Sequence, residues 1–179
     1  MTALSIPTVI EQALELARHH LVKRGIRVVQ EFSPDLPLIR GDRQELEQVF
    51  LILLTNASNA MPDGGTLTLC ASVEGRSARP GESGCGATET GTIGAARLVI
   101  EIADTSIGVS PENLPRVTEP LFTTRPLGTW TGLGLSNCRR IIEDHEGQVA
   151  ISSEVGRGTT VRISLPVVSG LDQANRRTA

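Results

Sequence analysis

Apolar residues repeat with helical spacing in three stretches of the chain. Residues 5–22 form one amphipathic pattern. Residues 42–61 form a second pattern, whose buried face would consist of Leu46, Val49, Phe50, Leu53, Leu54, Ala57 and Ala60. A third pattern predicts a helix that runs to about Glu146, with Gly147 as its C-cap. The spacing therefore predicts three helices, each with one apolar face to bury.

The helix predicted over residues 42–61 also carries polar residues at two places. Asp42, followed by Glu45 three residues later, predicts a capping box at its start. Asn56 and Asn59 fall on one flank beside the buried face, near its C-terminal end. Two asparagines on a helix flank are usually just solvated. Asn is a mediocre helix former, however, so a ligand-binding role stays open.

Shorter apolar runs predict strands and a hairpin. The strands cover residues 27–32, 66–73 and 97–104, and the hairpin covers residues 148–165 with its turn at 156–158. Helices that alternate with early strands, followed by a late helix and a final hairpin, predict an α+β fold. We expect a two-layer α/β sandwich with the helices on one face of a mixed, mostly antiparallel sheet.

Three segments contain few apolar residues that could be buried. Residues 74–96 are rich in Gly, Ser, Glu and Thr, which is typical of a flexible loop. Residues 105–132 contain four prolines and no apolar periodicity, and an irregular stretch of that length in a compact domain is functional or disordered. Residues 169–179 are predicted to be a disordered tail. The remaining pattern predicts one domain over residues 1–168.

Residues 128–137 combine glycines with small polar residues and lead directly into the third predicted helix. Glycine lets backbone N–H groups turn toward a ligand, and a helix start adds unpaired donors and a positive dipole end. A phosphate chain is the natural ligand of such a loop. The same Gly-x-Gly spacing also caps and links elements where no ligand binds, so both interpretations stay open.

An acidic residue ends the apolar strand predicted over residues 97–104. The carboxylate of Asp104 could accept a hydrogen bond from an exocyclic amine, and Gly108 would allow a flat ring to approach the backbone. Adenine offers such an amine, whereas guanine presents an oxygen there. An Asp after a strand is also a common turn residue, and that alternative remains.

Composition excludes several classes of protein. Lys23 is the one lysine among 17 Lys and Arg residues, and it lies far from every glycine loop. A P-loop and a protein-kinase fold each need a lysine at the phosphates, so neither is expected. A net charge of −3 and 2% aromatic residues do not suit a nucleic-acid partner.

Apolar runs and cysteines bear on the compartment. No apolar run is long enough to span a membrane, so no membrane segment is expected in this chain. Three scattered cysteines without metal-ligand spacing suit a reducing cytoplasm. Of these, Cys70 and Cys138 are predicted to fill the core, and Cys85 is predicted to be an exposed thiol in a loop.

The ordered segments resemble the nucleotide boxes of the histidine-kinase, gyrase, chaperone and mismatch-repair ATPase superfamily, and specifically the sensor histidine kinases. Residues 48–61 are similar to the N box, 104–108 to the first glycine box, 119–126 to the F box, 131–135 to the second glycine box and 156–166 to the closing strand. The resemblance spans residues 4–168 and implies the Bergerat ATP-binding fold, with an ATP lid over about residues 105–132.

The resemblance also implies a role for each matching residue. Asn56 would hold Mg²⁺ through its side-chain oxygen, and Asn59 would lie near the phosphates of ATP. Asp104 would accept from the adenine amine, and Gly108 would allow the base to approach. The triphosphate would be surrounded by Thr123, Thr124, Arg125, Gly128, Thr129, Thr131, Gly132, Leu133, Gly134 and Leu135. Asn56 and Arg125 would be catalytic, because Arg125 would meet the charge on the γ-phosphate.

The function implied is that of a histidine kinase catalytic domain. It would bind Mg-ATP and donate the γ-phosphoryl group to a histidine on a separate helical dimerisation domain, in a pathway with a response regulator receiver domain. None of the three histidines resembles a phosphoacceptor. His19 and His20 are expected on the exposed side of the first helix, and His145 is expected near a helix C-terminus, where a cation is mildly favoured.

Three residues depart from the family pattern. Ile52 stands where sensor kinases usually have a second Asn, and Ser106 and Trp130 replace usual glycines. These departures keep two alternatives open. One is a degenerate pseudokinase or phosphotransfer scaffold, and the other is a serine kinase of the anti-sigma type.

Overall fold

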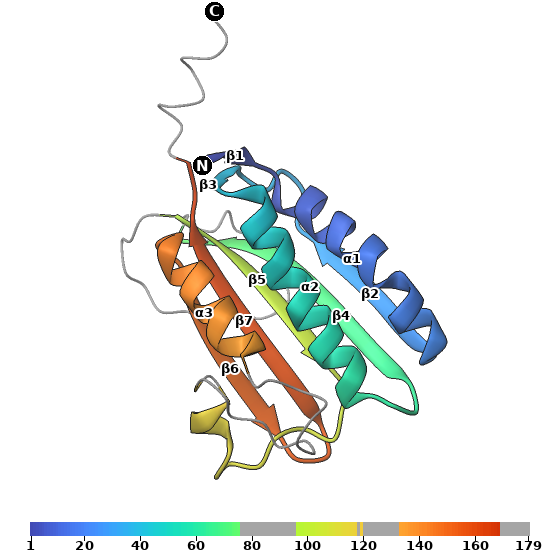
Figure 1. Cartoon of the computed structure of the whole chain (residues 1–179). Coiled ribbons are helices and arrows are strands. Elements are labelled where there is room, and N and C mark those ends of the chain that lie inside the picture. Colours follow the sequence, from blue (N-terminus) through green and yellow to red (C-terminus); the bar gives the residue numbers. More distant parts are fainter. Residues whose placement is uncertain (76–95, 118, 120–132, 169–179) are drawn as a thin grey trace, which may run out of the picture.

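The computed structural model describes residues 1–75, 96–117, 119 and 133–168 of the 179-residue chain. Within these residues three α-helices cover one face of a five-stranded sheet (Figure 1). The helices are α1 (Ile6–Lys23), α2 (Arg43–Ala60) and α3 (Gly134–Asp144). The strands of the sheet are β2 (Ile26–Phe32), β4 (Gly65–Glu74), β5 (Arg97–Asp104), β6 (Gln148–Glu154) and β7 (Gly158–Pro166).

The sheet has the order β2-β4-β5-β7-β6. Strands β2 and β4 are parallel, and the other three pairs are antiparallel. The predicted two-layer α+β sandwich with a mixed, mostly antiparallel sheet is therefore confirmed. The structure adds a small antiparallel pair, β1 (Thr2–Leu4) with β3 (Ile39–Gly41), and a 3₁₀ turn η1 (Leu114–Arg116). Strands of three residues are too short to show an alternating pattern, so the sequence did not predict them.

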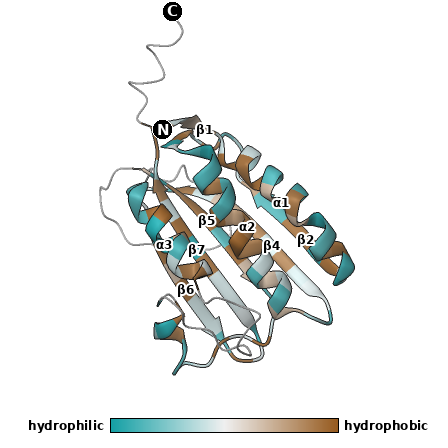
Figure 2. Ribbon diagram, viewed as in Figure 1, coloured by the Kyte–Doolittle hydropathy of each residue, from teal (hydrophilic) through white to brown (hydrophobic). Residues whose placement is uncertain are grey.

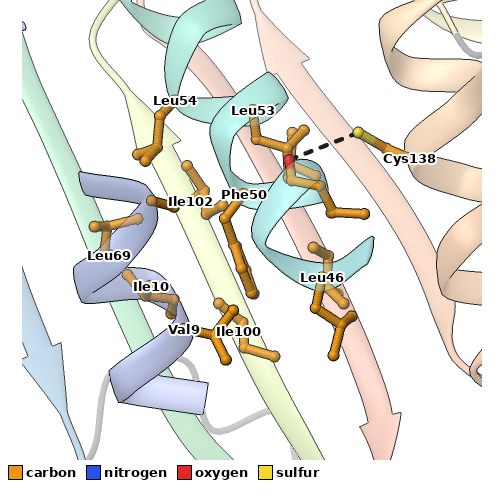
Figure 3. Packing of buried hydrophobic residues seen from close by; sticks show 14 of the residues in the cluster. Val9, Ile10, Leu46, Phe50, Leu53, Leu54, Leu69, Ile100, Ile102 and Cys138 are labelled. Carbon is orange, nitrogen blue, oxygen red and sulfur yellow. Dashed lines mark hydrogen bonds between the residues drawn. The ribbon is translucent and has the colours of Figure 1, made fainter. Parts of the chain in front are cut away.

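The core lies between the helices and the sheet. Phe50 of α2 is fully buried and packs among apolar residues of α1 and β5 (Figure 3). Strand β4 buries Leu67, Leu69 and Ala71 on this face, as its alternation predicted. Hydrophobic and hydrophilic residues alternate along α1 and α3 in Figure 2, as helices with one buried face require.

The two described cysteines occupy different environments. Cys138 is buried between α3 and α2, and its Sγ donates to the carbonyl oxygen of Val49 at 3.7 Å (Figure 3). Burial raises the pKa of the Cys138 thiol to about 12, so the prediction of a core residue is confirmed. The prediction for Cys70 was wrong. It alternates with the buried residues of β4, is only half-buried, and its Sγ lies 3.7 Å from Glu31 Oε2.

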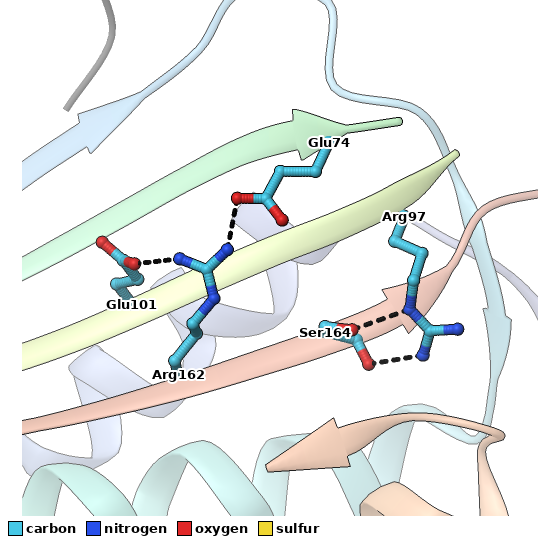
Figure 4. A network of polar contacts seen from close by, with 5 residues as sticks. All are labelled: Glu74, Arg97, Glu101, Arg162 and Ser164. Carbon is cyan, nitrogen blue, oxygen red and sulfur yellow. Dashed lines mark hydrogen bonds and ion pairs between the residues drawn. The ribbon is translucent and has the colours of Figure 1, made fainter. Parts of the chain in front are cut away.

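The sheet face turned away from the helices is polar. Arg162 of β7 forms ion pairs with Glu101 of β5 and Glu74 of β4, so one guanidinium joins three strands (Figure 4). The hydrogen bond that Arg162 donates to Glu74 is the largest cause of the raised pKa of Arg162. Arg97 donates to the hydroxyl of Ser164 at 2.7 Å on the same face.

The start of α2 differs from the predicted capping box in one half. Asp42 Oδ1 accepts from the backbone N–H groups of Gln44 and Glu45 at 2.9 and 3.2 Å, as an N-cap should. The reciprocal bond, in which the Asp42 N–H would donate to the Glu45 carboxylate, does not form. That N–H donates instead to Nε2 of His145, at 2.9 Å.

His145 is the C-cap of α3 and is buried, with 3% of its surface exposed. Its Nε2 accepts from Asp42, so its Nδ1 donates to the carbonyl of Ile141 at 2.7 Å. Both ring nitrogens are therefore engaged by backbone groups. The predicted position of His145 near a helix C-terminus is confirmed, and its ring joins two helices instead of facing solvent.

The prediction that Gly147 is the C-cap of α3 was wrong, because the C-cap is His145. Glu146 takes the left-handed conformation, with φ of 57°, and its N–H donates to the carbonyl of Glu143 at 2.9 Å. The N–H of Gly147 donates to the carbonyl of Ile142 at 2.8 Å, which completes a Schellman motif. A side chain at Gly147 would meet Ile142 and Leu165, so glycine is needed there for close packing.

Candidate nucleotide-binding site

Asp104 is the last residue of β5. The C-terminal ends of α1 and α2 and the β6–β7 turn lie at the same end of the molecule (Figure 1). Oδ1 of Asp104 accepts from the backbone N–H of Ser106 at 3.0 Å and of Thr159 at 3.1 Å. Among the described residues, no hydrogen bond is made to Oδ2. Two bonds to one oxygen hold the carboxylate in place and leave the other oxygen as an acceptor for an amine.

The turn after Asp104 is held by side-chain hydroxyls. Ser106 is buried, and its Oγ accepts from the N–H of Gly108 at 3.2 Å. Among the described non-glycine residues, those with a positive φ are Asp35 and Glu146. Ser106 is not one of them, so it occupies the turn without left-handed backbone strain. Ser106, which stands where the resemblance leads us to expect glycine, therefore adds a hydrogen bond to this turn.

Gly108 is required here for a reason that the sequence did not show. Its φ is 73°, and a Cβ at this position would collide with the backbone oxygen of Glu154. Close approach to β6 therefore already demands glycine. Whether a ring also approaches Gly108 stays a prediction.

Ser153 connects the turn to the β6–β7 hairpin, and sequence reasoning missed it. Its Oγ accepts from the N–H of Val109 at 2.8 Å and lies 2.8 Å from the carbonyl of Gly158 and 2.9 Å from Oγ1 of Thr159. Thr159 in turn donates its N–H to Asp104. The signal was present in β6, where serine takes the place of a third apolar residue after Val149 and Ile151 on the helix-facing side.

The predicted flank of α2 lies against the start of α3. A Cβ built on Gly134, the first residue of α3, would lie 3.1 Å from Cγ2 of Ile52 and 3.7 Å from Nδ2 of Asn56. Among the described residues, no side chain forms a cap hydrogen bond at the start of α3, and Ser136 Oγ donates to the carbonyl of the exposed residue Leu133. Within the described part of the chain, the first N–H groups of α3, including that of Leu135, therefore have no side-chain partner, and this helix end beside Asn56 is open.

Asn59 has a partner that the sequence did not predict. Its Oδ1 accepts from Nη2 of Arg24 at 2.9 Å, across 35 residues of sequence. Arg24 is the C-cap of α1, so the contact joins the ends of α1 and α2. Its nearness to phosphates remains a prediction.

The remaining expectations fall on residues outside those that the structure describes. They concern Phe122, Thr123, Thr124, Arg125, Gly128, Thr129, Trp130, Thr131 and Gly132, together with Cys85, most of the 74–96 loop and the 169–179 tail. Within the described ranges, no group of three or more His, Cys, Asp or Glu residues could hold a metal ion. None of the described helices is long and apolar enough to cross a membrane.

Comparison with known proteins gives one family. Residues 41–169 match the family model described as histidine kinase-, DNA gyrase B-, and HSP90-like ATPase. Sensor kinase CckA of Brucella abortus is 35% identical over 154 residues, which are 86% of this chain and 16% of that protein. Sensor histidine kinase ZraS of Escherichia coli is 30% identical over 167 residues, which are 93% of this chain and 31% of that protein. The chain thus spans less than a third of either relative.

Solved structures share the fold. The mycobacterial sensor histidine kinase MprB superposes with a TM-score of 0.71 at 22% identity, and the match covers 93% of this chain and 97% of that one. Full-length ShkA in complex with AMPPNP superposes with a TM-score of 0.73 at 25% identity, over 93% of this chain and 31% of that one.

Proposed function

We propose that this chain, which belongs to the family of histidine kinase-, DNA gyrase B- and HSP90-like ATPases, binds Mg-ATP and donates its γ-phosphoryl group to a histidine on a separate dimerisation domain. The curated relatives bear the names of sensor kinases, which supports this choice within the family. The acceptor is expected on a helical domain, and a response regulator receiver domain is expected to take the phosphoryl group next.

The observation that carries the proposal is the orientation of the Asp104 carboxylate. Its Oδ1 is engaged by two backbone N–H groups, while Oδ2 is open among the described residues. A carboxylate that is already oriented loses little freedom when it accepts an exocyclic amine, which favours binding. Adenine carries this amine at C6, where guanine carries a carbonyl oxygen, so the site should select ATP over GTP.

The phosphates would lie between Asn56 and the open N-terminus of α3. These two features are adjacent, and together they supply an amide oxygen and unpaired N–H donors. Asn56 fits a hard cation with one oxygen ligand, whereas Ile52 one turn earlier offers none. Bound Mg²⁺ would neutralise charge on the phosphates. Arg125 is proposed to meet the charge that develops on the γ-phosphate.

One observation favours the pseudokinase as a second candidate. Ile52 packs against Gly134 at the start of α3, so an apolar side chain occupies the flank where a second polar ligand would be expected. A serine kinase of the anti-sigma type remains the other alternative, and the identity of the phosphorylated residue distinguishes it.

Nucleotide titration by calorimetry tests the adenine site. The unmodified chain should bind ATP more tightly than GTP. Asp104→Ala should weaken ATP binding by tens-fold, because loss of a charged hydrogen-bond partner costs about 2 kcal/mol. Glu154→Ala, an exposed acid at the same end of the molecule, is the matched control and should bind ATP as before. Equal affinity for ATP and GTP would overturn the assignment.

Transfer to an acceptor tests the chemistry. With labelled ATP, the isolated chain should acquire no stable label but should label a separately supplied dimerisation domain from its own kinase. Asn56→Ala should abolish that labelling, because Mg²⁺ is no longer placed. Acid-stable label on an added protein would favour the serine kinase. Transfer that appears only after Ile52→Asn would favour the pseudokinase.

A further inference from the structure

Arg24 places a positive charge at the edge of the candidate site. It caps the C-terminus of α1, and its backbone N–H donates to the carbonyl of His20 at 3.3 Å. The backbone oxygens of Arg24 and Gly25 also lie against Gly64 in the turn after α2. The backbone of this half-buried arginine is therefore held in the structure, and its side chain extends to Asn59 of α2.

The partner of Arg24 is a neutral amide. Many arginines among the described residues instead form ion pairs with carboxylates: Arg18, Arg116, Arg139, Arg140, Arg157 and Arg162. Within the described part of the chain, no carboxylate contacts the Arg24 guanidinium. A half-buried cation without a counter-charge is unfavourable, and a bound anion would offset that cost.

The position of this charge is defined by a row of polar groups. Arg24 contacts Asn59, and Asn59 lies one turn after Asn56 on the same flank of α2, with about 5–6 Å between such Cβ atoms. Asn56 lies beside Gly134 and the open start of α3. The row therefore has a guanidinium at one end and a helix N-terminus at the other, and both favour anions.

We propose that Arg24 binds the phosphate chain of the nucleotide, with Asn59 holding its guanidinium in position. The inference rests on the proposed function and adds a residue of α1 to that site. It also accounts for a feature of the composition, because Lys23 is the chain's one lysine and arginine must therefore supply the other side-chain cations. A planar guanidinium can donate to the amide with one edge and to a phosphate with another.

Titration with adenosine, AMP, ADP and Mg-ATP separates this role from a purely structural one. Arg24→Gln should weaken ADP and Mg-ATP about tenfold, as expected for one lost phosphate contact, and leave adenosine affinity unchanged. Lys23→Gln is the matched control, since it removes the same charge from the neighbouring exposed residue, and should leave all four affinities nearly unchanged. Arg24→Lys should fall between the native chain and Arg24→Gln.

A second variant keeps the test valid if Arg24→Gln unfolds. Asn59→Ala leaves the charge but releases the guanidinium, and should weaken ADP more than adenosine. Unchanged ADP and ATP affinities in Arg24→Gln, or an equal loss for adenosine and ADP in both variants, would overturn the inference while adenine binding stands. If the native chain binds neither adenosine nor any adenine nucleotide, the proposed function fails and the inference fails with it.

Discussion

The two ends of the helix layer treat their polar groups in opposite ways. Where α2 begins and α3 ends, Asp42 caps one helix, a Schellman motif closes the other, and the buried ring of His145 joins them. Where α2 ends and α3 begins, no side chain of the described residues caps the start of α3. We call these the closed end and the open end.

The difference teaches where stability and binding are expected to reside. A satisfied buried polar group contributes to folding, and removing its partner is costly. Unpaired N–H groups and an uncompensated arginine contribute little to folding but are available to a ligand. Variants at the closed end should therefore change the free energy of unfolding and spare nucleotide binding, whereas variants at the open end should affect binding.

The largest effect is expected at His145. Replacement by Ala leaves the Asp42 N–H without its acceptor, removes the bond from the ring to the Ile141 carbonyl and opens a cavity, so the free energy of unfolding should fall by about 3 kcal/mol. Urea denaturation measures this change. His19→Ala, on the exposed side of α1, is the control and should have almost no effect. A loss at His145 no greater than at His19 would contradict the closed-end description.

A smaller effect is expected at Ser153, which holds the turn after Asp104. Ser153→Ala removes the acceptor of the Val109 N–H and should cost about 1.5 kcal/mol of stability. It should also weaken ATP binding, because the turn that orients Asp104 is loosened. Ser152→Ala is a matched control on the same strand, since Ser152 is exposed on the opposite sheet face. Stability loss with native ATP affinity would show that this turn does not orient the site.

The N-cap at Asp42 should contribute less than either of these. Asp42→Ala loses two hydrogen bonds to backbone N–H groups but keeps the bond to His145, which uses the backbone of Asp42. We expect a loss of about 1 kcal/mol in denaturation, with ATP affinity unchanged. Asp42→Asn should recover most of the lost stability. A change in ATP affinity would break the separation between the two ends.

The smallest effect is expected on the surface of α3, close to His145. Arg140 and Asp144 form an exposed i, i+4 ion pair at 2.8 Å. Arg140→Gln should lower stability by less than about 0.5 kcal/mol, and less still in high salt. A larger loss would mean that surface charge, and not the buried ring, stabilises the closed end.

Local patterns predicted the elements, because helical and strand periodicities are written in consecutive residues. The strand ending at Asp104 and the helix through Phe50 were both found in this way. The contacts that organise the site link residues far apart in sequence. Asp42 meets His145 across 103 residues, Asp104 meets Thr159 across 55, and Arg24 meets Asn59 across 35.

Two of the errors, at the ends of α2 and α3, have the same origin. Glu45 was expected to complete the cap of α2, but a buried histidine from a distant helix took its place. Gly147 was expected to end α3. Instead, Gly147 is needed for close packing against Leu165, and Glu146 adopts the left-handed conformation. In each case a tertiary contact overrode a local preference.

Strand β2 runs parallel to β4, so a hairpin cannot join them and the chain passes through α2 in between. Glu31 and Cys70, paired in this register, are 39 residues apart, whereas Glu154 and Gly158 pair across the short β6–β7 turn. Closing the longer loop costs more entropy, so β2 should join the edge of the sheet after the β6–β7 hairpin has formed. Pulse-labelled hydrogen exchange should show protection in β7 before β2. Arg24 lies two residues before the start of β2, so folding would bring its charge to the site only when the sheet is complete.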